Sequence, residues 1–207
     1  MSPQYTRQPP LDEAALDRDP MAQLARWLKD ATDAGMIEPT AMTLATATKD
    51  GRPSARIVLY KGPHEGGLTF YTNYESRKGG ELAANARAAL VFWWDQLERS
   101  VRIEGRVDKL PRAMGEAYAR SRPRGSQLGA LTSRQSRVVA SRAELEKRLA
   151  ENDAKLAGKE VPVPDNWGGY VLRPEMFEFW QGRRDRLHDR LVYRASGGGW
   201  RVERLEP

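Results

Sequence analysis

Three basic residues near the C-terminus, Arg186, His188 and Arg190, have the types and spacing of a ligand site. Alternate side chains of a strand share a face, so we expect these three on one face and Leu187 and Leu191 on the other, directed toward a core. At a rise of about 3.3 Å per residue, the two arginines would lie roughly 13 Å apart with the histidine midway. That span suits a planar ligand bearing an anion. A solvated polar face on an edge strand has the same pattern, and the spacing alone leaves both interpretations open.

A second group of cations lies in the first half of the chain. Ser76 can cap a helix whose free N–H groups and positive dipole end favour a phosphate, and Arg77 and Lys78 add charge there. Arg56 and Lys61 bracket an apolar run and are five residues apart, so a regular strand would direct them to opposite faces. They share a site only if the chain bends between them. The alternative is two solvated cations at the rim of a barrel.

Other kinds of site lack support in the sequence. We find no set of His, Asp and Glu residues with metal-ligand spacing, so we expect no metal. The chain has no Gly-x-Gly-x-x-Gly and no phosphate-loop lysine motif, so neither a Rossmann dinucleotide site nor a nucleoside triphosphatase is predicted. Several tryptophans could stack on a flavin or a base, although tryptophan in strands also fills cores.

Composition limits the class of protein further. With 207 residues and 40% hydrophobic content, the chain can bury one substantial core. It has no cysteine, which excludes disulfides and cysteine nucleophiles and fits a reducing, cytoplasmic location. No apolar run approaches the ~20 residues of a membrane span, so we expect no membrane association. Acidic residues are interspersed with the excess of six positive charges, which argues against a nucleic-acid-binding tail and fits anionic small ligands.

The elements that would position these residues are mostly strands. Residues 1–19 are polar and contain proline, which indicates a mobile arm, and Asp19-Pro20 begins a helix that ends near Gly35. Strands follow, with a short helix near Glu81–Asn85: Met42–Thr48, Ser54–Tyr60, Leu68–Thr72, Ala88–Trp94 and Ser100–Lys109. Five strands by residue 110 suggest a barrel.

The second half of the chain contains fewer and more widely spaced strands. Pro111 can open a helix that carries Tyr118 and Arg122 on one face and ends at Pro123. The polar stretch Ser121–Arg137 indicates a functional loop or a linker, and Ser141 caps a helix that runs to about Leu156. The last predicted strands are Gly169–Leu172, Met176–Trp180, Leu187–Tyr193 and Trp200–Leu205. The predicted class is mainly β with flanking helices (α+β).

Several of these blocks together resemble the pyridoxamine 5′-phosphate oxidase family, and their order and spacing extend over residues 20–207. They are Arg56–Lys61, Phe70-Tyr71-Thr72-Asn73, Glu75-Ser76-Arg77-Lys78, Ser121–Gln127, Gln135-Ser136, Trp167-Gly168-Gly169, Glu178–Gly182 and Arg186–Arg190. The resemblance implies an antiparallel FMN-binding split β-barrel as a single domain over residues 20–207. It also implies a homodimer with FMN at the subunit interface, in which strands of residues 167–207 complete the site and the dimer contact.

The resemblance also implies roles for individual residues. FMN would be held by Arg56, Ile57, Val58, Leu59, Tyr60, Lys61, Tyr71, Thr72, Arg77, Lys78, Gln135, Ser136, Trp180 and Arg190. Lys61, Tyr118, Arg122 and Ser126 would bind the substrate phosphate. Arg186, Leu187 and His188 would contact the pyridine ring, with Arg186 and His188 as the catalytic pair that orients C4′ toward the flavin.

The activity implied by this resemblance is oxidation of pyridoxamine 5′-phosphate and pyridoxine 5′-phosphate to pyridoxal 5′-phosphate, with dioxygen as acceptor and hydrogen peroxide as product. Three features depart from the expected pattern: Ser100 replaces a flavin-contacting glutamine, Leu131 replaces a tryptophan, and the N-terminal arm lacks an arginine pair. The alternatives are a phenazine-type FMN oxidase, which would not need the substrate-phosphate set, and a non-catalytic flavin-binding or basic nucleic-acid-binding protein. The scattered acidic residues argue against nucleic-acid binding.

Overall fold

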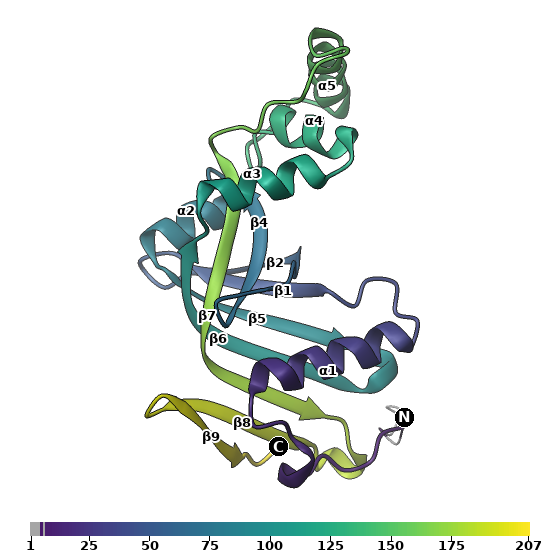
Figure 1. Cartoon of the computed structure of the whole chain (residues 1–207), viewed down its shortest axis with the longest axis vertical. Coiled ribbons are helices and arrows are strands. Elements are labelled where there is room, and N and C mark those ends of the chain that lie inside the picture. The colour runs from purple at the N-terminus through teal and green to yellow at the C-terminus, as the bar shows by residue number, and fades with distance from the viewer. Residues whose placement is uncertain (1–4, 6) are drawn as a thin grey trace.

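The computed structural model describes Tyr5 and residues 7–207, which form one antiparallel sheet with helices packed around it (Figure 1). The helices are α1 (Pro20–Asp33), α2 (Arg77–Ala84), α3 (Arg112–Ser121), α4 (Arg124–Thr132) and α5 (Arg142–Lys155). The strands are β1 (Ala41–Ala47), β2 (Pro53–Leu59), β3 (Pro63–His64), β4 (Gly67–Asn73), β5 (Arg87–Trp94), β6 (Arg99–Lys109), β7 (Trp167–Gln181), β8 (Asp189–Ser196) and β9 (Gly199–Arg204). The predicted antiparallel, mainly β class with flanking helices is confirmed.

Strand β7 connects the two ends of the sheet. The strand order is β2-β1-β5-β6-β7-β4-β3, and β8 and β9 continue from the other half of β7. Its first half pairs with β4 and its second half with β8, while β6 runs along both. The register shifts between Glu104 and Gly105, where a Cβ on the glycine would lie 2.0 Å from the Arg173 carbonyl oxygen. The strands can bend at this close approach because residue 105 has no side chain.

The core lies on one face of this sheet. Alternation along β6, β7 and β8 buries Val101, Phe177, Phe179 and Leu191 completely, as strand periodicity requires. Helix α1 covers part of the same face, and the Trp27 ring meets that of Phe179 edge-on with the ring centroids 5.1 Å apart. Each such buried aromatic or aliphatic side chain stabilises the fold by roughly 1.5–3 kcal/mol. None of the described helices is long and apolar enough to span a membrane.

The structure corrects the predicted elements of the second half. The stretch Ser121–Arg137, predicted as a loop or linker, contains helix α4, which buries Leu128. Pro123 follows the end of α3 and stands immediately before α4. A proline cannot continue a helix, but it is tolerated at a helix start because the N–H that it lacks would have no partner within the helix there. The two strands predicted on either side of Pro174 form one continuous strand, β7.

The predicted strand around Arg186 is also wrong in part. Residues Arg184–Arg186 form a 3-10 turn, in which Asp185 and Arg186 have positive φ angles of 57° and 61°, and β8 begins only at Asp189. The left-handed turn interrupts the alternation of faces, so Leu187 is 72% exposed and does not reach the core. Leu191 is buried as predicted. The 13 Å spacing of the two arginines, which assumed an extended strand, does not apply.

The described part of the N-terminal arm lies against β8 and β9. The backbone N–H of Leu11 donates to Asp189 Oδ2 over 3.0 Å, and the hydroxyl of Tyr193 donates to the carbonyl of Asp17 over 2.6 Å. The Arg204 guanidinium donates to the Leu11 carbonyl over 2.9 Å. The mobile arm was predicted over residues 1–19, of which 1–4 and 6 lie outside the described residues. Its mobility and its separation from the domain of residues 20–207 stay predictions.

Candidate active site

A cleft of about 270 Å³ is lined by half of the residues predicted to bind cofactor or substrate. It lies between the end of β2, β4, the start of α2, helix α3 and the start of β7. Its lining residues are Ile57, Val58, Leu59, Lys61, Tyr71, Thr72, Lys78, Tyr118, Arg122, Gln135 and Trp167. All of them except Trp167 belong to the predicted cofactor or substrate set. Residues from five separate segments of the chain therefore converge on one place.

Lys78 is the most deeply buried cation of this cleft. It is 8% exposed, and its Nζ donates to Thr72 Oγ1 over 3.0 Å and to Gln135 Oε1 over 2.9 Å. Among the described residues, it forms no ion pair with a carboxylate. Burial lowers the pKa of Lys78, as does the nearby Arg56, whereas Glu81 raises it. A buried ammonium that has only neutral oxygen partners favours an anion beside it.

The start of α2 adds backbone groups to this anion subsite. Ser76 caps the helix, with its Oγ accepting from the Gly79 N–H over 3.3 Å. A Cβ on Gly79 would lie 2.0 Å from the carbonyl oxygen of Tyr74, so the tight entry into the helix requires glycine. The first turn carries unpaired N–H groups and the positive end of the helix dipole, which complement the charge of Lys78.

An aromatic wall forms the opposite side of the cleft. The rings of Tyr71 and Tyr118 stack with their centroids 4.0 Å apart, and Trp167 lies 6.0 Å from each of them. The Arg122 guanidinium stands 5.1 Å from the Trp167 ring centroid. Lys61 follows the end of β2, where its N–H donates to the Thr69 carbonyl over 2.9 Å. Lys61 and Arg122 thus add two more cations to the cleft lining, beside the stacked rings.

Two of the predicted phosphate-binding arginines lie just outside the cleft lining. Arg56 Nη2 donates to Glu81 Oε2 over 3.2 Å, and Arg77 Nε donates to Glu81 Oε1 over 2.9 Å. Burial alone would raise the pKa of Glu81, but hydrogen bonds from Ser54, Thr46 and the two arginines outweigh it and lower this pKa to about 2. Lys61 therefore lines the cleft, whereas Arg56 is held by Glu81 outside the lining.

Three further predicted residues, Tyr60 and Ser136 for the cofactor and Ser126 for the substrate, are not part of the cleft lining. Tyr60 packs against Phe92 with ring centroids 6.1 Å apart, and burial raises the pKa of Tyr60 to about 12. Ser126 is in the first turn of α4, and Ser136 has a positive φ of 71° in the exposed loop after it. Neither serine lines the cleft in the single chain.

The predicted catalytic pair belongs to a second group at the far end of β7. The His188 ring lies 4.7 Å from that of Trp180, and His188 Nδ1 accepts from the Arg183 backbone N–H over 3.0 Å. Burial, together with Arg186, lowers the pKa of His188, which favours a neutral ring with its proton on Nε2. Arg190 Nε donates to the buried Glu178 over 2.7 Å.

The two groups are too far apart to meet on one ligand within one chain. Trp167 of the cleft and Trp180 of the second group are both on β7, separated by thirteen residue positions. At a strand rise of about 3.3 Å per residue, that is roughly 40 Å along the strand. In Figure 1, β7 runs from beneath α3 to its pairing with β8 near the opposite end of the molecule.

Glu81, Glu178 and Trp167 are the prominent residues that were not assigned roles from the sequence. The spacing of Arg77 and Glu81, four apart on a predicted helix, was the available signal for Glu81. Glu178 is two residues from Trp180 and so shares its face of β7. No group of three or more His, Asp and Glu residues within the described chain could hold a metal ion.

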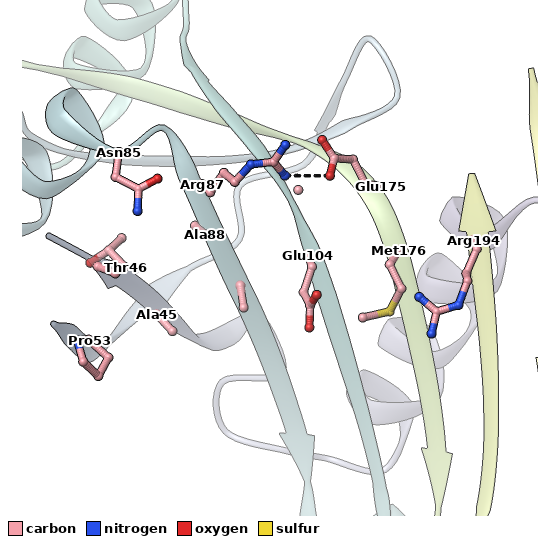
Figure 2. A pocket seen from close by; sticks show the side chains of 13 residues that line it. Ala45, Thr46, Pro53, Asn85, Arg87, Ala88, Glu104, Glu175, Met176 and Arg194 are labelled. Carbon is pink, nitrogen blue, oxygen red and sulfur yellow. Dashed lines mark hydrogen bonds and ion pairs between the residues drawn. The ribbon is translucent and has the colours of Figure 1, made fainter. Parts of the chain in front are cut away.

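A larger cleft on the sheet face opposite the core contains none of the predicted site residues. It encloses about 580 Å³ between β1, β5, β6, β7 and β8, and Figure 2 shows Glu104, Met176 and Arg194 side by side along its floor. An ion pair between Arg87 and Glu175, with a nitrogen–oxygen distance of 2.8 Å, closes one side (Figure 2). This cleft lacks the buried cation and stacked rings of the smaller one.

An antiparallel sheet that bends around such a cleft belongs to the class of flavin-binding split barrels. Residues 28–154 match the profile described as "Pyridoxamine 5'-phosphate oxidase", and residues 167–207 match "Pyridoxine 5'-phosphate oxidase C-terminal dimerisation region". The chain belongs to the pyridoxamine 5′-phosphate oxidase family.

Individual relatives agree with this assignment. The chain is 55% identical over 204 residues to the pyridoxine/pyridoxamine 5′-phosphate oxidase of Rubrobacter xylanophilus, covering 99% of this chain and 94% of that protein. It is 57% identical to the enzyme of the same name from Salinibacter ruber, covering 91% and 89%. Among solved structures, PhzG from Burkholderia lata in complex with tetrahydrophenazine-1-carboxylic acid superposes with a TM-score of 0.89 at 33% identity, covering 95% and 98%. An FMN-binding protein from Nostoc punctiforme, 16% identical with a TM-score of 0.72 and coverage of 93% and 99%, shares the fold.

Proposed function

We propose that this protein is an FMN-dependent oxidase that converts pyridoxamine 5′-phosphate and pyridoxine 5′-phosphate to pyridoxal 5′-phosphate. Dioxygen is the acceptor and hydrogen peroxide the product. The observation that carries this proposal is the pair of cationic subsites in one cleft, with Lys78 at the start of α2 and Lys61 with Arg122 beside the aromatic wall. A flavin phosphate and a substrate phosphate each require such a subsite.

The residues present fit FMN in particular. Lys78 is a buried cation without a carboxylate partner among the described residues, and it adjoins a serine-capped helix start. Thr72 and Gln135 both accept from its ammonium, and the Thr72 hydroxyl donates to Gln135 Oε1 over 3.0 Å, which leaves the Gln135 amide N–H groups to donate to a phosphate. When bound, the flavin accepts a hydride from the substrate and passes the electrons to dioxygen.

The substrate phosphate would bind to Lys61, Tyr118, Arg122 and Ser126. In the structure the first three line the cleft, and Ser126 is on the next helix, α4. Arg186, Leu187 and His188 would cover the pyridine ring and hold C4′ in place for the transfer. A neutral His188 can offer its Nε2–H as a hydrogen-bond donor, because Nδ1 already accepts from the backbone. The protein's part in the reaction is then mainly orientation of the substrate.

We further propose that the active enzyme is a homodimer in which each site takes residues from both copies. The cleft and the Trp180–His188 group are separated by roughly 40 Å along β7, so a second copy must bring the latter to the former. The sheet face opposite the core exposes Ile57 (65%) and Trp93 (48%), which a dimer contact would cover. The match of residues 167–207 to a dimerisation region supports this arrangement. The absence of cysteine supports a cytoplasmic location.

A phenazine-type FMN oxidase is the second candidate, favoured by the close superposition with PhzG. The decisive experiment loads the purified protein with FMN and compares pyridoxamine 5′-phosphate with unphosphorylated pyridoxamine, following pyridoxal 5′-phosphate absorbance and peroxide. We expect kcat/KM for pyridoxamine 5′-phosphate to be at least a hundredfold higher than for pyridoxamine, a difference of about 2.7 kcal/mol. The reason is that Lys61 and Arg122 have no anionic partner when the substrate lacks its phosphate. Flavin binding without turnover of either compound would reject the proposed activity.

A further inference from the structure

A buried carboxylate lies directly behind the proposed FMN phosphate subsite. Glu81, in the second turn of α2, is 5% exposed. Its Oε1 accepts from Arg77 Nε over 2.9 Å, and its Oε2 accepts from Ser54 Oγ over 2.6 Å and from Arg56 Nη2 over 3.2 Å. The Thr46 hydroxyl bonds the same Oε2. A single acidic group thus joins β1, β2 and α2.

The direction of every hydrogen bond in this cluster follows from the donors. A guanidinium has no acceptor, so the hydroxyls of Thr46 and Ser54, which both contact Arg56, must accept from it. Each hydroxyl then donates its own proton to Glu81. The cluster is complete only with an ionised carboxylate, and the lowered pKa of Glu81, about 2, keeps it ionised at neutral pH.

Glu81 also balances charge at the subsite. Arg56, Arg77 and Lys78 would otherwise be three neighbouring cations that repel one another before a phosphate arrives. Two of these cations are bonded directly to the carboxylate, and the third, Lys78, feels it electrostatically. The charged groups that act on Lys78 are Arg56 from β2 and Glu81 from α2, while its hydrogen-bond partners Thr72, Ser76 and Gln135 are uncharged.

We propose that Glu81 is a positioning residue for the FMN phosphate, which holds Arg56 and Arg77 in place beside Lys78. This inference rests on the proposed function, because it assumes that the start of α2 receives the FMN phosphate. Glu81 does not touch the phosphate itself. Its negative charge would oppose a direct contact.

The test measures FMN affinity of Glu81→Ala and Glu81→Gln by equilibrium titration of the purified apoprotein at pH 7. Glutamine keeps an acceptor for Thr46 and Ser54, so Arg56 stays in place, whereas alanine releases both arginines. We expect Glu81→Ala to bind FMN at least tenfold more weakly than wild type and Glu81→Gln to recover part of that loss. The matched control is Glu146→Ala on α5, where Arg142 and Glu146 form the same i,i+4 pair with a nitrogen–oxygen distance of 2.7 Å away from the cleft. It should bind FMN as wild type does.

The pH profile separates positioning from a merely structural role. FMN binding should weaken as pH rises and Lys78 loses its proton. Because Glu81 raises the pKa of Lys78, Glu81→Gln should move this alkaline loss to lower pH, and Glu146→Ala should not. The inference is overturned if folded Glu81→Gln loses FMN affinity at the same alkaline pH as wild type. It is also overturned if folded Glu81→Ala binds FMN with wild-type affinity. If Glu81→Ala does not fold, the Glu81→Gln profile decides. If the wild-type protein itself binds no FMN, the proposed function fails instead.

Discussion

Lys78 is buried, has a lowered pKa and bonds only uncharged side chains. We therefore expect FMN affinity to depend on this side chain more than on any other. We predict that Lys78→Met lowers FMN affinity about a hundredfold, roughly 2.7 kcal/mol, because the phosphate loses a charge-assisted hydrogen bond in a desolvated place. Fluorescence titration of free FMN measures the change. Lys147→Met, at an exposed position of α5, is the control and should have no effect. Equal affinity in both variants would remove Lys78 from the phosphate subsite.

The pH dependence of wild-type FMN binding follows from the same residue. The pKa of Lys78 is lowered mainly by burial, so the charged form that binds a phosphate is lost at a lower pH than for an ordinary lysine. Affinity should therefore fall as pH rises through this lowered pKa. A titration series in alkaline buffers checks this, with Lys78→Met as the reference that lacks the transition. A wild-type curve parallel to that of Lys78→Met would contradict the assignment.

Arg186 and Arg190 should have different phenotypes although they are only four residues apart. Arg186 follows the left-handed turn next to His188, and we predict that Arg186→Ala keeps FMN affinity but lowers kcat/KM a hundredfold or more, about 2.7 kcal/mol. Arg190 is fixed by Glu178, and Arg190→Ala should weaken FMN binding. Steady-state kinetics with added FMN and a flavin titration distinguish the two. Loss of flavin in Arg186→Ala, with normal turnover once FMN is restored, would reject its substrate role.

At the level of elements, sequence periodicity predicted strands such as β1, β5 and β6 because alternate residues of each are buried. It failed where the chain leaves regular geometry. The alternation that correctly buried Leu191 wrongly placed Leu187 in the core, since the positive φ of Asp185 and Arg186 cannot be read from residue types that tolerate many conformations. Helix α4 was missed because its polar sequence buries only Leu128. Strong periodicity was absent there, and tertiary contacts decide the conformation.

The candidate site was predictable where short motifs carry their own chemistry, such as the capped Ser76-Arg77-Lys78 start of α2. It was not predictable where the chemistry depends on long-range contacts. Glu81 is defined by Thr46 and Ser54, which are distant in sequence and meet it only when β1, β2 and α2 pack together. Glu178 likewise forms ion pairs with Arg102 on β6 and Arg190 on β8, which are distant in sequence or on another strand. A single sequence contains no signal for such pairs.

The bend between β6 and β7 gives a prediction for stability. A Cβ at residue 105 would lie 2.0 Å from a backbone carbonyl oxygen, so Gly105→Ala should lower the free energy of unfolding by about 1–3 kcal/mol. Gly125→Ala is the control, because no atom lies within 4 Å of its added Cβ and it is helical, so a gain of about 0.5–1 kcal/mol is expected. Urea denaturation of both apoproteins measures the difference. Equal stability would mean that the strands can part at the bulge without cost.

For the whole molecule, a site shared between two copies predicts complementation between inactive variants. In a mixture of Arg122→Ala and Arg186→Ala chains refolded together, each mixed dimer has one site with both residues intact and one with both replaced. Random pairing makes half of the dimers mixed, so activity should return to about a quarter of the wild-type value, although each variant alone is inactive. Activity assays after co-refolding measure it, with separately refolded variants mixed afterwards as control. No recovery in mixed dimers of confirmed composition would place both residues in one subunit's site.

Strand β7 also constrains how such a protein can change over evolutionary time. Trp167 faces the cleft near one end of the strand, and Trp180 stands beside His188 near the other. Inserting or deleting one residue between them would reverse the facing of every side chain beyond that point and shift the separation of the two groups by about 3.3 Å. In a dimer both active sites would be displaced by the same change, because no loop interrupts β7 between the two groups. Helix α5 contributes nothing to the cleft lining, so insertions and deletions should accumulate there while the length of β7 stays fixed.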